Sequence, residues 1–389
     1  MPRRNSLIHG GAFLLSFVVT GGGTGGHIYP ALAIARGLKD RFQAQVFYIG
    51  GTLGLESEIV PKEGLPFRAI PLAGLKRGFS PSNVLVGWKA AAGIKRSLGY
   101  LREIRPSAVI GTGGYVCGPV VLAAALLGIP ALIHEQNALP GITNRILSRF
   151  SGYVAVTFEE SRKFFPARVA VKTTGLPVRK EVFMKNREKG RIDIGLPPGG
   201  LLILSFGGSQ GARSINIAML PVLEHFSGYP GMHFLHVTGP NNYKEFIAAA
   251  GSMKIPHNGN ITIVSYMHDM PSALSAADLA ICRAGAATLA ELTAVGMPSI
   301  LIPYPYAAEN HQEYNARALE RKGAAVVVRD SELSSDLLVS EIERLVSSPG
   351  TLEKMSCASK KLGRPGAMED ILDCVQYLLD NKRKQGKSF

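Results

Sequence analysis

Residues 20–34 read TGGGTGGHIYPALAI and directly follow the end of an apolar run at residues 13–19. An apolar strand that leads into a glycine loop and then into a helix is typical of a Rossmann-like nucleotide-binding unit. Glycine lets the backbone approach a ligand closely, and the first turn of the helix offers its free N–H groups. The stretch therefore predicts a parallel α/β sheet with a ligand site at its carboxyl edge.

The same design recurs along the chain. Glycine-rich loops also follow apolar runs at residues 111–115 (GTGGY) and 207–212 (GGSQGA). Helical patterns, such as those at residues 29–39 and 118–127, lie between short β-rich runs, which predicts parallel sheets covered by helices. The expected strands are residues 14–20, 45–49, 108–110, 131–133, 153–156, 201–206, 234–238, 262–264, 279–282, 299–302 and 324–328. We therefore expect an α/β protein of two Rossmann-like domains, with parallel sheets that face each other across a cleft.

Length and composition agree with two domains. The chain has 389 residues, of which 46% are apolar and 19% charged, enough for two cores of ordinary size. The pattern breaks at residues 174–177 (TGLP), and the polar segment 179–200 follows. We place the domains at residues 1–176 and 177–363, and expect a C-terminal helix in residues 364–389 to pack back on the first domain.

The net charge of +14 favours a polyanionic partner, such as a phosphorylated substrate, an anionic lipid or a nucleic acid. Basic and apolar residues interleave between residues 75 and 96, around Trp88, the one tryptophan in the chain. This pattern suits an anionic membrane surface, although an amphipathic helix packed on the sheet is the alternative. The apolar run at residues 13–19 is too short for a signal peptide, and no run reaches the length of a spanning helix.

The motifs argue against a nicotinamide or metal site. The second expected strand ends YIGGT at residues 48–52, without the acidic residue that holds a dinucleotide ribose. No D-x-D, C-x-x-C or H-E-x-x-H sequence occurs. We expect no cofactor and no metal, so that helix dipoles and backbone N–H groups would stabilise a diphosphate.

Several polar residues stand at expected strand ends. His27 opens the helix after the first loop, where a general base for a hydroxyl would lie, although a lone histidine is often structural. Residues 134–137 (HEQN) suit a cleft wall. Glu291 is placed to accept the hydroxyls of a ribose or to be a solvated helix acid. Gln312 and Asn315 share a helix face and suit sugar hydroxyls.

Taken together, six motifs resemble the MurG family of UDP-N-acetylglucosamine:undecaprenyl-diphospho-muramoylpentapeptide N-acetylglucosaminyltransferases. They are residues 20–34, 111–121 (GTGGYVCGPVV), 134–137, 207–212, 283–292 (RAGAATLAEL) and 310–312 (NHQ), and the resemblance runs in register from about Phe17 to about Gly363. It implies a GT-B fold and inverting transfer of N-acetylglucosamine to the C4 hydroxyl of the lipid-linked muramoyl-pentapeptide, a step of peptidoglycan biosynthesis. It also implies peripheral attachment to the cytoplasmic face of the cell membrane.

The resemblance also implies roles for individual residues. His27 becomes the expected general base, with Glu135 as its rival, and the first domain takes the acceptor while the second takes the UDP-sugar. The donor-side residues are Thr24, Gly25, Gly26, Asn137, Arg179, Ser209, Met267, Gly285, Ala286, Ala287, Thr288, Leu289, Ala290, Glu291 and Gln312. The acceptor-side residues are Tyr115, His134 and Asn144.

The chain departs from the family pattern at its first eleven residues, at Leu176, where Asn is common, and at Cys282, where Ser is common. Two other classes of protein remain as alternatives. A UDP-sugar epimerase of the same fold would need neither a lipid acceptor nor a membrane patch. A basic nucleic-acid-binding protein would bind DNA in a strongly salt-dependent way and would not need three glycine loops; we expect no nucleic-acid partner.

Overall fold

The computed structural model describes residues 15–72, 82–197, 199–256 and 259–385; of residues 82–89 and 383–385 only the backbone is described. The chain forms two compact units. The first comprises Met1–Ile133, Ile146–Tyr153 and Leu372–Phe389, and the second comprises His134–Arg145 and Val154–Ile371.

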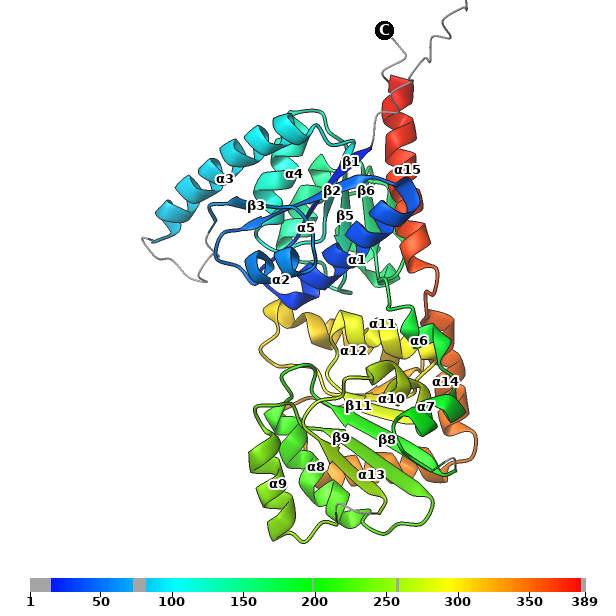
Figure 1. Ribbon diagram of the computed structural model, residues 1–389. Helices are drawn as coiled ribbons and strands as arrows, with labels where there is room; N and C mark the ends of the chain where they lie inside the picture. Colours follow the sequence, from blue (N-terminus) through cyan, green and yellow to red (C-terminus); the bar gives the residue numbers. More distant parts are fainter. Residues whose placement is uncertain (1–14, 73–81, 198, 257–258, 386–389) are drawn as a thin grey trace, which may run out of the picture. The chain divides into compact units, whose positions relative to one another are not determined.

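A seven-stranded sheet has the order β3-β2-β1-β4-β5-β6-β7 (Figure 1). Each strand pair with a described register is parallel. Its strands are β1 (Ser16–Thr20), β2 (Gln45–Gly51), β3 (Phe67–Ile70), β4 (Ala108–Gly111), β5 (Ala131–Glu135), β6 (Tyr153–Val156) and β7 (Val171–Thr173). Its helices are α1 (Gly25–Phe42), α2 (Glu56–Lys62), α3 (Ser82–Ile104), α4 (Cys117–Leu126), α5 (Ile142–Leu147), η1 (Ser148–Phe150) and η2 (Glu159–Phe164).

The strand order places the first two glycine loops together. The chain leaves β1 toward β2 and later returns to β4 on the other side of β1, so the sheet reverses its winding between β1 and β4. Ligands of open parallel sheets bind at such a reversal, beyond the carboxyl ends of the strands. The loops after β1 and β4 both begin at this point.

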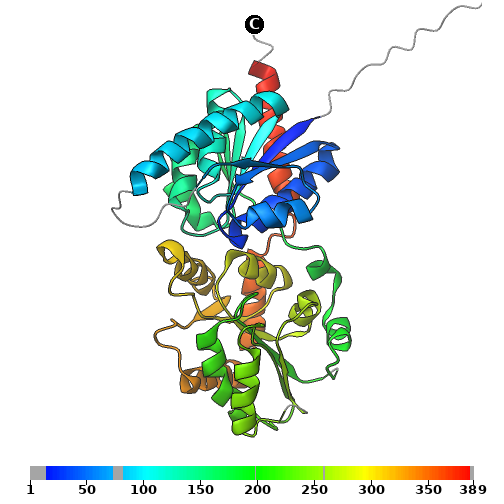
Figure 2. The same ribbon diagram turned by 60° about the vertical axis from the view of Figure 1, so that its left-hand side comes forward.

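A six-stranded sheet repeats the design with the order β10-β9-β8-β11-β12-β13 (Figure 2). Its strands are β8 (Leu201–Phe206), β9 (Met232–Val237), β10 (Ile261–Val264), β11 (Leu279–Cys282), β12 (Ser299–Leu301) and β13 (Ala325–Val327). The winding reverses between β8 and β11, where the third glycine loop and residues 283–285 begin. The helices that follow β7 are α6 (Glu181–Met184), α7 (Arg187–Asp193), α8 (Arg213–His225), α9 (Tyr243–Ser252), α10 (Met270–Ala276), α11 (Ala286–Val295), η3 (Ala308–Asn310), α12 (His311–Glu320), α13 (Ser335–Ser347), α14 (Thr351–Leu362) and α15 (Ala367–Gln385).

Apolar residues on both faces of the central strands drive this arrangement. All four residues of β4 and all four of β11 are buried, as expected for parallel strands covered by helices on both sides. The last part of α15 belongs to the first unit, where Tyr377 meets Tyr153 edge to face and Asp373 pairs with Arg41. The predicted α/β class and the two parallel sheets are confirmed.

In the part of the chain that the structure describes, no helix has the length and apolar character needed to cross a bilayer. Much of the expected membrane stretch cannot be compared with the structure: Leu75, Lys76, Arg77, Gly78 and Phe79 lie outside the described residues. Residues 84–89 are helical, in the first turns of α3. Lys95 and Arg96, further along α3, are exposed.

Candidate active site

The first two glycine loops are joined by hydrogen bonds at the carboxyl edge of the first sheet. The Gly22 N–H donates to the Gly113 carbonyl at 3.3 Å, and the Thr112 hydroxyl donates to the His27 carbonyl at 2.8 Å. His27 Nδ1 lies 3.0 Å from the Thr112 carbonyl oxygen. Because a carbonyl only accepts, Nδ1 carries the proton, and the lone pair of the neutral ring lies on Nε2. The half-buried His27 is thus held in the tautomer that a general base requires.

A buried carboxylate that sequence reasoning did not single out lies beneath the first loop. Glu56, in the first turn of α2, is fully buried and accepts hydrogen bonds from the N–H groups of Gly23 and Gly51, at 3.1 and 3.0 Å. The Tyr48 hydroxyl supports the same loop by donating to the Gly21 carbonyl at 2.7 Å. In sequence Glu56 is only an acid at a helix start, which is common, so no local signal marks it.

Tyr115 and Cys117 follow the second loop. Tyr115 is half-buried, and burial, together with the nearby Glu56 carboxylate, raises the pKa of its hydroxyl. Burial also raises the pKa of the Cys117 thiol to about 12. Cys117 therefore stays protonated and donates to the Thr20 carbonyl, so it is a structural thiol and not a nucleophile.

The cluster after β5 is buried, and its polar groups are paired with one another. Glu135 accepts from the N–H groups of Asn137 and Gly141 and from the side chains of Asn137 and Asn144. Burial raises its pKa, and these bonds oppose the rise. His134 bonds through Nε2 to the Gly175 carbonyl, and burial lowers its pKa to about 4, so it is neutral at pH 7. Four donors on one buried carboxylate indicate a group that shapes its loop.

Asn315 lies against the same loop within the second unit. It is fully buried, accepts from the Ala138 N–H at 2.8 Å, and donates to Asn137 Oδ1 and to the Ala284 carbonyl. Its amide is therefore used within the protein, unlike that of the half-buried Gln312 on the same helix. Gln312 Oε1 accepts from the N–H groups of Ala284 and Tyr304, and the side-chain NH₂ group takes no part in these two bonds.

The third loop and the N-terminus of α11 lie at the winding reversal of the second sheet. Ser209 is exposed in the loop. Gly285 is the N-cap residue of α11, and no side chain caps the helix there, so the N–H groups of the first turn have neither an intrahelical partner nor a side-chain cap. A helix N-terminus of this kind favours an anion. Ala287 is exposed and Gly285, Ala286, Thr288 and Ala290 are half-buried, whereas Leu289 points into the core.

Glu291, on the same helix, is mostly buried and pairs with Arg179, whose Nε donates to Oε1 at 2.8 Å. Burial raises the pKa of Glu291, and Arg179 opposes the rise. The structure therefore brings these two predicted donor residues together. Met267 is half-buried after β10.

Sequence reasoning also missed the role of Arg283, directly after β11. Its guanidinium pairs with Asp330 and donates to Ser214 Oγ and to the carbonyls of Ile302 and Pro303. It thereby connects the segments that follow three strands of the second sheet. Its partners are far away in sequence, so only the fold reveals them.

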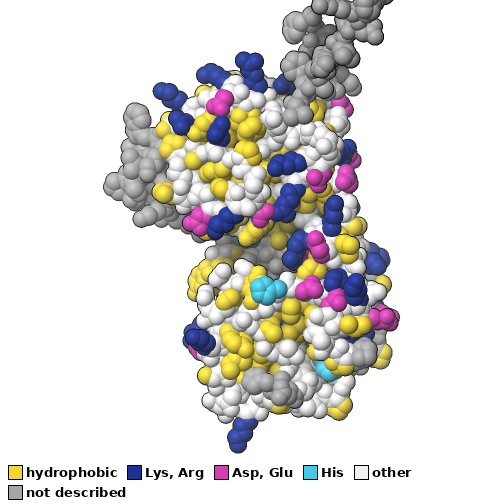
Figure 3. Space-filling view, viewed as in Figure 1, with side chains coloured by type: hydrophobic (Ala, Val, Ile, Leu, Met, Phe, Trp, Pro, Cys, Tyr) yellow, Lys and Arg dark blue, Asp and Glu magenta, His cyan; other side chains and the backbone are white. Residues whose placement is uncertain are grey.

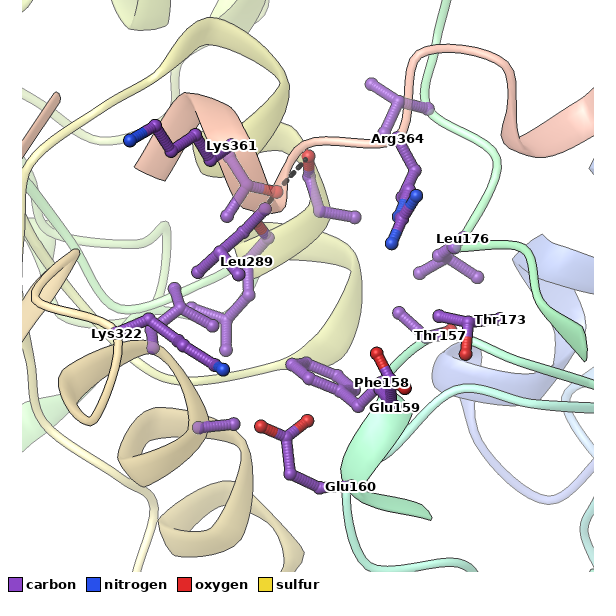
Figure 4. Close-up of a pocket in the computed structure, with 17 residues that line it drawn as sticks. Thr157, Phe158, Glu159, Glu160, Thr173, Leu176, Leu289, Lys322, Lys361 and Arg364 are labelled. Carbon is purple, nitrogen blue, oxygen red and sulfur yellow. Dashed lines mark hydrogen bonds between the residues drawn. The ribbon is translucent and has the colours of Figure 1, made fainter. Parts of the chain in front are cut away.

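A cavity of about 300 Å³ lies in the second unit, and its lining includes Val178 and Ala290, the chain neighbours of Arg179 and Glu291 (Figure 4). Leu289 and Ala290 are the two predicted site residues that line it. The side chains of Lys322 and Arg364 point into it, while Lys361 points away. Apolar side chains such as Leu289 and charged ones such as Lys322 line this cavity together, whereas the sites at the two sheet edges are formed by glycine loops.

Among the residues that the structure describes, no group of three or more His, Cys, Asp or Glu side chains is placed to hold a metal ion. In each sheet, a glycine loop and the start of a helix lie at the winding reversal. Such edges suit a phosphorylated ligand.

Two domain models of one glycosyltransferase family match successive parts of the chain. The N-terminal domain of glycosyltransferase family 28 matches residues 17–156, and the C-terminal domain of that family matches residues 202–371. The UDP-N-acetylglucosamine--N-acetylmuramyl-(pentapeptide) pyrophosphoryl-undecaprenol N-acetylglucosamine transferase of Desulforudis audaxviator is 54% identical over 93% of this chain and 98% of its own length. Its namesake from Desulforamulus reducens is 50% identical over 94% and 99%.

Solved structures agree with these relatives. The crystal structure of Acinetobacter baumannii MurG aligns with a TM-score of 0.78 and 31% identity, over 93% of this chain and 99% of that one. The UDP-GlcNAc 2-epimerase of Neisseria meningitidis aligns with a TM-score of 0.65 at 15% identity, over 94% of this chain and all of that one, which shows a shared fold alone. With its two parallel α/β sheets of the GT-B type, the chain belongs to glycosyltransferase family 28.

Proposed function

We propose that this enzyme transfers N-acetylglucosamine from UDP-N-acetylglucosamine to the C4 hydroxyl of undecaprenyl-diphospho-N-acetylmuramoyl-pentapeptide, with inversion at the sugar. The observation that carries the proposal is the 54% identity to a transferase of that name, extending over nearly the whole length of both chains. The product is a lipid-linked disaccharide-pentapeptide, so the reaction is a step of peptidoglycan synthesis.

We assign the acceptor to the domain at residues 1–176 and the donor to the domain at residues 177–363. The second domain carries the open N-terminus of α11 and the acidic Glu291, which suit a diphosphate and a ribose. The first carries His27 and the half-buried Tyr115 beside two joined glycine loops. We also assign the C-terminal helix in residues 364–389 to the first domain, since α15 from Leu372 onward belongs to the first unit.

The proposed chemistry is a direct displacement at the anomeric carbon. His27 Nε2 takes the proton of the acceptor hydroxyl while the oxygen attacks, and UDP leaves with the electron pair of the glycosidic bond. The hydrogen bond from Nδ1 to the Thr112 carbonyl holds the ring in the tautomer that accepts this proton. The N-terminus of α11 stabilises the charge that develops on the leaving diphosphate.

Donor recognition is proposed to use groups of differing chemistry. Glu291 accepts the ribose hydroxyls, and Arg179 keeps it charged and oriented. Gln312 offers its side-chain NH₂ to the sugar, while its oxygen is anchored to Ala284 and Tyr304. Met267 offers its backbone to uracil. The remaining proposed contacts are Thr24, Gly25, Gly26, Asn137, Ser209 and the first turn of α11.

On the acceptor side, Tyr115 is proposed to contact the substrate. The buried His134 and Asn144 are proposed to act through the loop they hold, because both are turned toward protein partners. Asn315 is proposed to orient Asn137 in the same way.

We propose that the enzyme binds the cytoplasmic face of the membrane through the region around α3. Lys and Arg side chains gather on the first unit near this helix (Figure 3). Leu126 on α4 and Ile146 and Phe150 nearby are exposed apolar residues, and α4 packs on α3 and η1. Exposed apolar side chains surrounded by basic ones favour an anionic bilayer surface.

A transfer assay tests the proposal. The purified chain is given UDP-N-acetylglucosamine, radiolabelled in the sugar, and a lipid-linked muramoyl-pentapeptide. We expect the label to enter the lipid only when both substrates are present. Epimerised UDP-sugar formed without acceptor would instead establish an epimerase, and salt-sensitive DNA binding without transfer would establish a nucleic-acid-binding protein.

A further inference from the structure

A single carboxylate joins the first glycine loop to the end of β2. Glu56 Oε2 accepts from the Gly23 N–H and Oε1 from the Gly51 N–H. Because the side chain is fully buried, neither bond has water as a ready substitute. Glu56 thus ties together two loops that β1 and β2 present at the same sheet edge.

Glycines surround this carboxylate. A Cβ atom added at Gly22, Gly50 or Gly54 would lie 2.6, 2.8 or 2.3 Å from the nearest atom of the Glu56 side chain. None of the three glycines has a positive φ. Their backbone conformations are therefore open to other residues. At Gly22 and Gly54 the Glu56 carboxylate excludes a side chain, and at Gly50 the Phe67 ring, at 2.5 Å, excludes it together with Glu56.

The same loop is fixed on its other side by the loop after β4. There the Gly22 N–H bonds to Gly113, and His27 exchanges two contacts with Thr112. Gly23 lies between these attachments and α1, whose first turn begins with the His27 N–H bonded to the Thr24 carbonyl. A shift at Gly23 would therefore pass directly to the turn that carries His27.

We propose that Glu56 is a positioning residue for glycosyl transfer: it fixes the first glycine loop at Gly23 and so sets the place of the His27 ring relative to the acceptor hydroxyl. The inference rests on the proposed function, in which His27 is the base. Displacing a catalytic group by about 1 Å costs about 10²-fold in rate, so such an anchor affects turnover more than binding.

The test compares Glu56→Gln with Glu58→Gln, a matched change at an exposed position of the same helix. The glutamine has one acceptor oxygen in place of two, so one of the two N–H groups loses its partner. We expect kcat to fall about 10- to 100-fold in E56Q, with calorimetric UDP affinity unchanged and faster amide hydrogen exchange in peptides that cover residues 20–30. E58Q should match the wild type in all three measurements.

A second pair of variants covers the case in which E56Q does not fold. Gly54→Ala puts a methyl group against the Glu56 carboxylate, whereas Gly99→Ala enters open space on α3. G54A should lose kcat and keep UDP affinity, and G99A should lose neither. A wild-type kcat in folded E56Q, or in G54A, overturns the positioning role. Absence of transfer by the wild type refutes the proposed function instead, and the exchange measurement then still tests whether Glu56 anchors the loop.

Discussion

The two candidate bases, His27 and Glu135, differ in what surrounds them. His27 is half-buried and its Nδ1 is held by the Thr112 carbonyl, whereas Glu135 is fully enclosed and accepts from four donors. A base must reach the hydroxyl it deprotonates. The geometry therefore favours His27 as the base and gives Glu135 the task of shaping the loop after β5.

We expect His27→Ala to lower kcat about 10²- to 10⁴-fold, the usual contribution of a positioned base. Calorimetric UDP affinity should change little, because the donor nucleotide is assigned to the second domain. Steady-state kinetics with the lipid acceptor measure the first quantity. Lost UDP affinity with an unchanged kcat would make His27 a donor ligand. A collapse of kcat in a folded Glu135→Ala variant but not in His27→Ala would move the base to Glu135.

Glu291 predicts a pH dependence of donor binding. A carboxylate accepts two hydroxyls, whereas its protonated form must donate from one oxygen. Burial raises the pKa of this group, so protonation begins at a higher pH than for a free glutamate. As the pH falls through that raised pKa, the affinity for UDP-N-acetylglucosamine should fall.

Calorimetric titrations from neutral pH into the acid range measure this dependence. Glu291→Gln keeps the shape of the side chain but has no proton to gain. It should bind about 10- to 100-fold more weakly at neutral pH, the cost of one hydrogen bond to a charged group. Its affinity should then stay flat as the pH falls. An equally steep pH dependence in E291Q would assign the titration to another group.

The strands show which parts of the fold follow from sequence. The predicted strands at residues 153–156, 201–206 and 279–282 coincide with β6, β8 and β11, and the other predicted strands overlap observed ones. The two missed strands, β3 and β7, are the outer strands of the first sheet. Each is short and carries a basic residue, Arg68 or Lys172. An edge strand is only partly covered, so it lacks the apolar run by which a buried parallel strand is recognised.

The site likewise contains residues that the sequence predicts and residues that only the fold reveals. Glycine loops and helix starts are local patterns, so the sequence alone indicates His27, residues 285–290 and Glu291. Glu56 and Arg283 depend on partners from distant segments, and nothing in their own neighbourhood predicts those contacts. The sequence also does not show which polar groups are already hydrogen-bonded within the protein. Asn315 has an amide that suits a sugar, but in the fold this amide bonds to Asn137, Ala138 and Ala284.

The basic and apolar stretch that ends in α3 predicts membrane binding. Reversing the charge of Lys76, Arg77 and Lys89 together should weaken binding to anionic vesicles, more at low salt than at high salt, because exposed charges are screened. Vesicle co-sedimentation measures this. A matched triple reversal at Lys189, Lys244 and Lys354, exposed lysines of the second unit, should have less effect. Equal loss in both variants would indicate a response to net charge alone, and no loss in the first would indicate an ordinary packed helix.

The proposed assignment of the donor to residues 177–363 can be tested on a fragment, because the second sheet has apolar clusters of its own. Both apolar clusters of the second sheet are formed by residues between Ile194 and Leu362; among the described residues only Phe158 joins them from outside. Arg191 holds the segment before β8 in place through the carbonyls of Pro197, Gly199 and Gly200. A fragment of residues 179–363 therefore retains nearly all of these apolar clusters and the hydrogen bonds of the buried Arg191. We expect it to fold alone.

This fragment should bind UDP within about tenfold of the full chain, a difference of no more than about 1.4 kcal/mol. UDP is the right probe because the groups proposed to hold its ribose, uracil and diphosphate, namely Glu291, Met267 and the first turn of α11, all lie within the fragment. The reciprocal fragment, residues 15–178, is the control and should bind UDP at least tenfold more weakly. Calorimetry measures the UDP affinity of both fragments. If residues 15–178 bind UDP and residues 179–363 do not, the donor site lies in the first domain. His27 would then lie in the domain that binds the nucleotide, and its assignment to the acceptor side would be wrong.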